Sequence, residues 1–194
     1  RPRQICAVRG PLSRRKILDS GLPCPDVVGD PALLLPRYFD ENVTKRHRIG
    51  LIPHFSHSGL VEFERLRQQG AEIVDITGDL FDVVRTVKSC GMVASSSLHG
   101  LIIADAYGVP SKWLQVEGHP IEDGFKFHDY LKSVGRTDLA AFVVTKKTML
   151  KDIESSFCQY EVKIDLDRLY ESCPFAAPPG ASVHGAWTQA GADA

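Results

Sequence analysis

The sequence has almost no excess of either charge and no long apolar run. Its 23 lysines and arginines nearly balance its 24 aspartates and glutamates, which leaves a formal net charge of −1 at pH 7. This balance argues against broad electrostatic binding to nucleic acid or to an acidic membrane surface. No segment reaches the apolar length that a helix needs to cross a bilayer. We therefore expect neither a nucleic-acid partner nor a membrane-spanning segment.

Paired cysteines are also lacking. No two cysteines form a C-x-x-C pair, and the five are odd in number and widely scattered: Cys6, Cys24, Cys90, Cys158 and Cys173. This pattern indicates neither a disulfide framework nor a zinc site. We expect free thiols in a reducing compartment, and hence a cytoplasmic protein with no bound metal.

Three common motifs of ligand binding and catalysis are absent. There is no G-x-G-x-x-G after the first expected strand, no G-x-x-x-x-G-K-[ST] and no G-x-S-x-G. These absences argue against a dinucleotide site, a P-loop kinase and an α/β-hydrolase. The chain also has no initiator methionine, and it opens Arg1-Pro2-Arg3-Gln4 directly before a strand-like run. We expect it to be a piece of a longer protein.

What the chain does have is an alternation of short apolar runs with helical segments. Strands are predicted over residues 5–8, 26–28, 48–52, 71–76, 92–94 and 111–116. Helices are predicted over residues 11–18, 59–69, 79–89, 126–134, 146–157 and 166–172, with a helical turn over 32–35. This alternation predicts an α/β fold with a Rossmann-like, doubly wound parallel sheet. We expect residues 1–173 to form this domain, and residues 174–194, rich in Pro, Ala and Gly, to be a disordered tail.

The most informative segment is VASSSLHG at residues 93–100, followed by an apolar run that ends at Gly108. It predicts a buried strand that ends in three serines, and then a helix with His99 in its first turn. The free N–H groups and positive dipole end of such a helix form an anion site. The dipole disfavours a charged imidazole and a bound dianion favours it, so the charge of His99 should depend on occupancy. Alternatively, Ser95 and Ser96 are only helix caps, and His99 is a surface residue or binds a neighbouring loop.

Polar side chains also follow other predicted strands. Arg9 follows the first strand, Asp30 the second and His54 the third, and the carboxyl ends of parallel strands meet at one edge of a sheet. Arg9 precedes glycine and a helix-starting proline, a setting that suits bidentate capture of phosphate or carboxylate. The alternative for Arg9 is an ion pair with a structural carboxylate such as Asp30.

Two further clusters leave their roles open. His54 follows Pro53, which ends a strand, so we expect the histidine to be accessible; His57 comes three residues later, but the spacing supplies no third metal ligand. In FKFHDY at residues 125–130, Lys126 and Asp129 have the spacing of a surface ion pair on a helix. Alternatively, this segment presents aromatic rings to a carbohydrate, the candidates being Phe125, Phe127 and Tyr130.

Taken together, the motifs VRGPLS, GDPA, IGLIPHF and SSSLHG at residues 8–13, 29–32, 49–55 and 95–100 resemble the polysaccharide pyruvyl transferase family. The segment FKFHDY with the later SVGR at residues 133–136 is similar to the family's bacterial exopolysaccharide branch. The resemblance covers residues 5–136. It implies the C-terminal half of a fold like that of GT-B glycosyltransferases, with the N-terminal half absent from this chain.

The resemblance also implies an activity and a site. The family transfers the enolpyruvyl group of phosphoenolpyruvate to two sugar hydroxyls and releases phosphate. Arg9 and His99 match residues that contact phosphoenolpyruvate, and His99 would act as the acid. The helix N-terminus at Ser96, Ser97 and Leu98 would help to hold the donor. Further candidate donor contacts are Asp30, His54 and Lys126.

No organic cofactor or metal is required by this chemistry. The implied acceptor is a sugar or a lipid-linked oligosaccharide, through which the protein could associate peripherally with the cytoplasmic membrane. The sequence departs from the family at Ser97, where many members carry arginine. Two other functions stay open. One is a GT-B glycosyltransferase domain that binds a nucleotide sugar, since its donor half has the same architecture; the other is a sugar- or anion-binding domain without turnover, which Ser97 favours.

Overall fold

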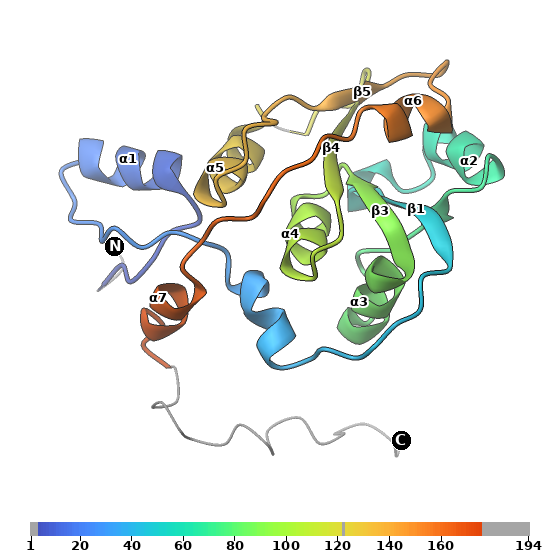
Figure 1. Cartoon of the computed structure of the whole chain (residues 1–194). Helices are drawn as coiled ribbons and strands as arrows, with labels where there is room; N and C mark the ends of the chain where they lie inside the picture. The colour runs from blue at the N-terminus through green and yellow to red at the C-terminus, as the bar shows by residue number, and fades with distance from the viewer. Residues whose placement is uncertain (1–3, 122, 176–194) are drawn as a thin grey trace, which may run out of the picture.

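The computed structural model describes residues 4–121 and 123–175 and contains a parallel five-stranded sheet (Figure 1). The strand order is β2-β1-β3-β4-β5, and all four pairings are parallel. The strands are β1 (His47–Ile52), β2 (Glu72–Ile73), β3 (Cys90–Ser95), β4 (Ser111–Val116) and β5 (Phe142–Val144).

Helices cover both faces of this sheet, which confirms the predicted Rossmann-like, doubly wound α/β fold (Figure 1). Side chains alternate between the faces of a strand, so Ile49 and Leu51 of β1 pack on one side and Ile52 on the other. The first side is covered by α2 (Val61–Gln68) and α6 (Leu150–Ser155). The second is covered by α3 (Leu80–Ser89), α4 (Leu98–Ala106) and α5 (Phe125–Ser133).

The α4 helix is apolar on every side because it is covered twice. The sheet lies beneath it, and the 3₁₀ helix η1 (Pro31–Arg37) packs against it from outside. Apart from the exposed His99, a helix in such a position has little solvent face, which is the physical reason for the continuous apolar run in the sequence. Its buried residues are Leu98, Gly100, Leu101, Ile102, Ile103, Ala104 and Asp105.

Three strand predictions were wrong. Residues 5–8 and 26–28 are not strands of the sheet, because they form only an isolated parallel bridge between Val8 and Val28. The expected strand over 71–76 shrinks to the two residues of β2. Strand β5 was missed, since it has three residues and only Val144 is buried. The predicted helix over 146–157 is the shorter α6, and that over 166–172 is α7 (Leu166–Glu171).

The segment around Arg9 is anchored to the domain by Asp129 of α5. Oδ1 of this buried carboxylate accepts the N–H groups of Leu12 (2.8 Å) and Ser13 (3.0 Å), and Oδ2 accepts the Ser13 hydroxyl (2.5 Å). Asp129 therefore caps α1 (Pro11–Asp19) from another helix, and α1 and α5 lie side by side (Figure 1). A Cβ at Gly10 would lie 2.1 Å from the Asp129 carbonyl, so this contact requires glycine. The expected surface pair of Lys126 with Asp129 is thus wrong.

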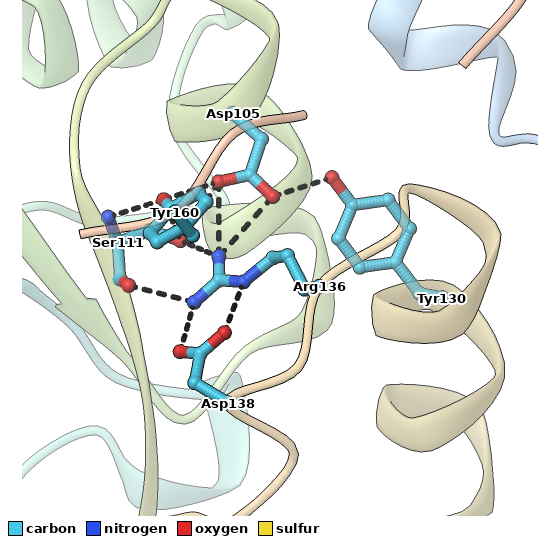
Figure 2. A network of polar contacts seen from close by, with 6 residues as sticks. All are labelled: Asp105, Ser111, Tyr130, Arg136, Asp138 and Tyr160. Atoms are coloured by element: carbon cyan, nitrogen blue, oxygen red, sulfur yellow. Dashed lines mark hydrogen bonds and ion pairs between the residues drawn. The ribbon is translucent and has the colours of Figure 1, made fainter. Parts of the chain in front are cut away.

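A buried polar network fixes the amino end of β4 to the end of α4 (Figure 2). The Arg136 guanidinium lies between two carboxylates, with its nitrogens 3.1 Å from Asp105 Oδ1 and 2.6 Å from Asp138 Oδ2. Tyr130 and Tyr160 donate to Asp105 at 2.8 and 2.7 Å. Burial and the neighbouring Asp105 raise the pKa of both phenols, so each stays protonated and donates.

The cysteines, the helix lengths and the C-terminal tail bear on three further expectations. All five cysteines are free thiols. Among the described residues, no helix has the length and apolarity needed to span a membrane. The predicted tail falls largely on residues 176–194, which lie outside the described part of the chain.

Candidate functional site

The strand order determines where a ligand crevice forms. The chain leaves β1 toward α2 on one face of the sheet and leaves β3 toward α4 on the other. Such a reversal opens a crevice outside the carboxyl ends of the two strands. Since β1 ends at Ile52 and β3 at Ser95, this topology places the expected crevice beside residues 53–54 and 96–99.

The turn from β3 into α4 is held tightly by Ser95. Its buried hydroxyl lies 2.9 Å from the Ile52 carbonyl and 2.7 Å from the Ser97 carbonyl, and it accepts the Ser97 N–H at 2.9 Å. A Cβ at Gly100 would lie 2.3 Å from this hydroxyl, so glycine lets α4 approach the strand. The predicted strand, turn and helix are confirmed here.

The N-terminus of α4 has no side-chain cap of its own. Ser97 is the N-cap residue, but its side chain makes no cap hydrogen bond. The dipole and the first N–H groups of α4 are therefore directed at the crevice, as an anion would require. Leu98 is buried, whereas His99 is exposed in the first turn, and no described residue binds its imidazole.

Ser96 connects three strand ends through a chain of hydrogen bonds. Its buried hydroxyl accepts the backbone N–H of His54 and lies 2.9 Å from Nδ1 of His57. Nε2 of His57 is 3.0 Å from the His119 carbonyl, beyond the end of β4. A carbonyl only accepts, so Nε2 must carry the proton, and Nδ1 accepts from the Ser96 hydroxyl. Burial lowers the pKa of His57, in agreement with this neutral form.

His54 has a different environment. It caps η2 (Phe55–His57), its Nδ1 lies 2.7 Å from the Ser56 hydroxyl, and its ring lies 4.2 Å from the Phe55 ring. It is half-buried beside the strongly exposed Phe55. The expectation of an accessible His54 is thus met only in part, while His57, which the sequence suggested only as a metal ligand, is the buried residue.

Arg9 and Asp30 lie together beside a separate cavity. Arg9 Nε is 3.5 Å from Asp30 Oδ2, and Asp30 Oδ1 also caps η1 by accepting the Ala32 N–H. The ion pair lacks hydrogen-bond geometry, so within the described residues Arg9 Nε is buried without a hydrogen-bond partner. The cavity is about 660 Å³ in volume, and its lining includes Arg9, Asp30, Leu34, Tyr38, Leu169 and Tyr170.

The structure groups the predicted site residues into two places. One place is the carboxyl ends of β1 and β3, where His54, Ser96, Ser97, Leu98 and His99 lie. The other is the cavity between η1 and α7, which Arg9 and Asp30 line. The two places are connected through η1, which packs against both α4 and α7. Lys126 lies on α5, half-buried, with its ammonium 5.9 Å from the centre of the Phe127 ring.

The structure also places the aromatic residues of α5. Phe127 and Tyr130 are buried in the core, so they cannot present their rings to a carbohydrate. The half-buried Phe125 is instead covered by the Lys16 ammonium, 3.8 Å from its ring centre. Among the described residues, no three His, Cys, Asp or Glu side chains are placed together as metal ligands.

Sequence reasoning missed the contacts of His57, His119 and Asp129. Their partners lie 39, 62 and 117 residues away along the chain. Local pattern carries no information about such pairs. For His57 the only available pattern was its position three residues after His54.

Fold and crevice together define an α/β protein whose candidate site combines a helix N-terminus with histidines. The chain belongs to the polysaccharide pyruvyl transferase family, whose model matches residues 1–117, more than half of the sequence. The resemblance found in the sequence motifs is thereby confirmed.

Two curated proteins are similar to the chain. It is 32% identical over 114 residues to "Uncharacterized protein L143" of Acanthamoeba polyphaga mimivirus, which covers 56% of this chain and 40% of that protein. It is 28% identical over 137 residues to "Succinoglycan biosynthesis protein ExoV" of Rhizobium meliloti (strain 1021), covering 69% and 41%. The chain thus spans less than half the length of either relative. No solved structure matches it significantly.

Proposed function

We propose that this chain is part of a pyruvyl transferase that acts in exopolysaccharide synthesis, with phosphoenolpyruvate as donor and two hydroxyls of one sugar as acceptor. Family membership carries the proposal, and the relative named for succinoglycan biosynthesis supports it. The uncapped N-terminus of α4, at the crevice where a parallel sheet binds ligands, suits an anionic donor.

Each candidate residue has a role in this proposal. The N–H groups at the start of α4, together with Ser97, hold the phosphate, and Arg9 supplies a guanidinium to the donor. Because Ser96 already binds His54 and His57, its contribution is to orient the turn. Asp30 holds Arg9 in place, and His54 and Lys126 add further contacts to the donor or acceptor.

The reaction balances without a cofactor. His99 gives a proton to the methylene carbon of phosphoenolpyruvate, and the adjacent carbon becomes cationic. One sugar hydroxyl forms a C–O bond to that carbon and returns its proton to the enzyme. The second hydroxyl forms the other C–O bond as the bond to phosphate breaks, and its proton leaves with phosphate. Alternatively, the methylene carbon takes its proton from solvent, and His99 protonates the departing phosphate.

The acceptor suggests where the protein works. A sugar on a lipid-linked oligosaccharide would bring the protein to the inner surface of the cytoplasmic membrane, and a cytoplasmic protein would meet phosphoenolpyruvate there. Fractionation of cells that express tagged protein tests this placement. Recovery only outside the cytoplasm would contradict it.

The function is tested by incubating the full-length protein with phosphoenolpyruvate and candidate lipid-linked oligosaccharides. We expect release of phosphate together with an acceptor whose mass has gained one pyruvyl ketal. Release of a nucleoside diphosphate from a nucleotide sugar would instead identify a glycosyltransferase. Binding of phosphoenolpyruvate with no turnover on any acceptor would identify a binding domain.

The donor site is tested by His99→Ala and Arg9→Ala. Loss of one general acid or one oxyanion contact typically lowers kcat by about 10² or more. His47→Ala, at the opposite end of β1, and Arg15→Ala, exposed on α1, serve as controls of the same residue type. Ketal formation near the wild-type rate in both site variants would contradict the assignment of His99 and Arg9 to the donor site.

A further inference from the structure

A groove of about 300 Å³ lies between the carboxyl ends of β1 and β2. We call it the Phe55 groove, and its lining includes His54, Phe55, Ser58, Asp75, Ile76 and Thr77. Its volume is at the lower end of the range for small-molecule sites. It adjoins the candidate donor site, because the His54 backbone N–H is bonded to the Ser96 hydroxyl.

One wall of this groove is an aromatic ring exposed to solvent. Phe55 keeps 67% of its surface exposed, although it lies in the short η2 turn at the ligand-binding edge of the sheet. Only one side of its ring has a close aromatic neighbour among the described residues, the imidazole of His54 at 4.2 Å. An exposed aromatic ring beside a crevice marks a surface for an apolar face of a ligand.

The opposite wall supplies hydrogen-bond acceptors. Asp75 Oδ1 accepts the N–H and the hydroxyl of Thr77, at 2.9 and 2.7 Å. These bonds lower the pKa of Asp75, so the carboxylate is ionised at neutral pH. The other oxygen, Oδ2, accepts no hydrogen bond from any described residue. Together with the exposed Thr77 oxygen, it can accept hydrogen bonds from neutral hydroxyls.

The aromatic ring of Phe55 and the carboxylate of Asp75 together favour one class of ligand in the groove. A sugar ring offers a face of C–H groups to an aromatic ring and hydroxyl donors to a carboxylate. A nucleoside diphosphate could also stack on Phe55, but the negative charge of Asp75 would repel its phosphates. The groove therefore suits the neutral partner, whereas the N-terminus of α4 suits the anionic one.

We propose that the Phe55 groove binds a neutral sugar ring of the acceptor beside the donor site, an assignment that rests on the proposed transferase function. Phe55 stacks on the sugar, and Asp75 accepts hydrogen bonds from its hydroxyls. The hydrogen bond from the His54 N–H to Ser96 keeps the groove, and hence the bound sugar, next to the start of α4, where the donor would lie.

The assignment is tested with Phe55→Ala and Asp75→Asn in the full-length protein. We expect each to raise the acceptor KM about tenfold, since stacking or a charge-assisted hydrogen bond is lost, with little change in the phosphoenolpyruvate KM. Asparagine keeps an oxygen for the two Thr77 bonds, so the turn should stay folded. Phe81→Ala on α3 and Asp19→Asn on α1 are matched controls outside the groove.

A second measurement separates this assignment from the transferase function. The wild type and both variants are applied to an array of neutral and acidic oligosaccharides, and to uridine diphosphate in solution. Glycan binding that both variants lose would support the groove even if phosphoenolpyruvate is never consumed. Turnover with an unchanged acceptor KM in both variants would overturn the groove and leave the function intact. Absence of glycan binding, or nucleotide binding that the variants lose, would also overturn it.

Discussion

The Ser96 hydroxyl has a single proton and two neighbours, and this determines the protonation of the residues around it. It accepts from the His54 N–H and donates to His57, whose other nitrogen then donates to the His119 carbonyl. All the groups in this series of three hydrogen bonds have partners only when His57 is neutral. The loops after β1 and β4 are thereby tied to the start of α4 through one buried imidazole.

Replacement of His57 should change how stability depends on pH. The pKa of His57 is lowered by burial, so the folded protein binds fewer protons than the unfolded chain just below pH 6.5. Its contribution is present above that value and is lost as the pH falls, at about 1.4 kcal/mol for each unit of pKa shift. We expect His57→Gln to flatten the fall in Tm between about pH 7 and pH 5.

Thermal unfolding at several pH values measures this slope. At pH 8 the comparison serves as its own control, because wild type and variant then differ only in hydrogen bonds and packing. An unchanged slope in His57→Gln would show that another group is responsible for the acid sensitivity.

Ser97 is the position where the sequence resemblance leads us to expect arginine in other family members. Its side chain does not cap α4, and an arginine there would reach from the N-cap into the crevice. We expect Ser97→Arg to lower the KM for phosphoenolpyruvate several-fold at low salt, since a guanidinium adds a charge-assisted contact to the donor. Ser97→Gln, long but uncharged, is the control. A higher KM with a lower Tm would indicate overpacking at this buried site.

At the scale of elements, the sequence could predict features that depend on neighbouring residues, but not those that depend on long-range contacts. The β3–α4 junction was predicted because its serines, glycines and apolar run act within a few residues of one another. Strand β5 was missed because three residues form no measurable alternation. Residues 5–8 look like a strand on composition, yet they pair with the sheet nowhere and form only the bridge from Val8 to Val28.

The α1 helix shows the same division. Pro11 and the following residues predicted a helix correctly, but nothing nearby shows that its cap comes from α5. Asp129→Ala would leave two N–H groups and the Ser13 hydroxyl without their acceptor. We expect a loss of about 1–3 kcal/mol in unfolding free energy, measured by denaturant titration. Asp129→Asn keeps one acceptor oxygen and should lose less.

Activity measurements make this prediction more specific. Because α1 follows directly after Arg9, loosening it should also raise the phosphoenolpyruvate KM. Asp19→Asn, which only weakens the surface pair with Arg15, should change neither quantity. Equal stability of Asp129→Ala and wild type would show that the cap contributes nothing.

At the scale of the whole molecule, the two ends of the sheet differ in their chemistry. The carboxyl end carries the exposed His99, the exposed Phe55 and an uncapped helix. Near the amino end of β4 lies the Arg136 network, in which the charged groups are buried and bonded to one another (Figure 2). Open polar groups suit ligands, whereas satisfied ones suit stability. From the strand ends, the sequence predicted His99 and the helix start but not the exposed Phe55. The Arg136 network joins residues up to 55 positions apart and could not be predicted.

Arg136→Met therefore tests whether the two ends are independent. The variant would leave Asp105 buried with both tyrosines but without its cation, and removing one partner of a buried ion pair costs about 3–5 kcal/mol. We expect a large fall in Tm with an unchanged KM for phosphoenolpyruvate in the protein that stays folded. Tyr160→Phe removes one hydroxyl and keeps the ring 3.6 Å from the guanidinium, so its Tm should fall by much less. A rise in the donor KM without loss of stability would show instead that the network acts on the site.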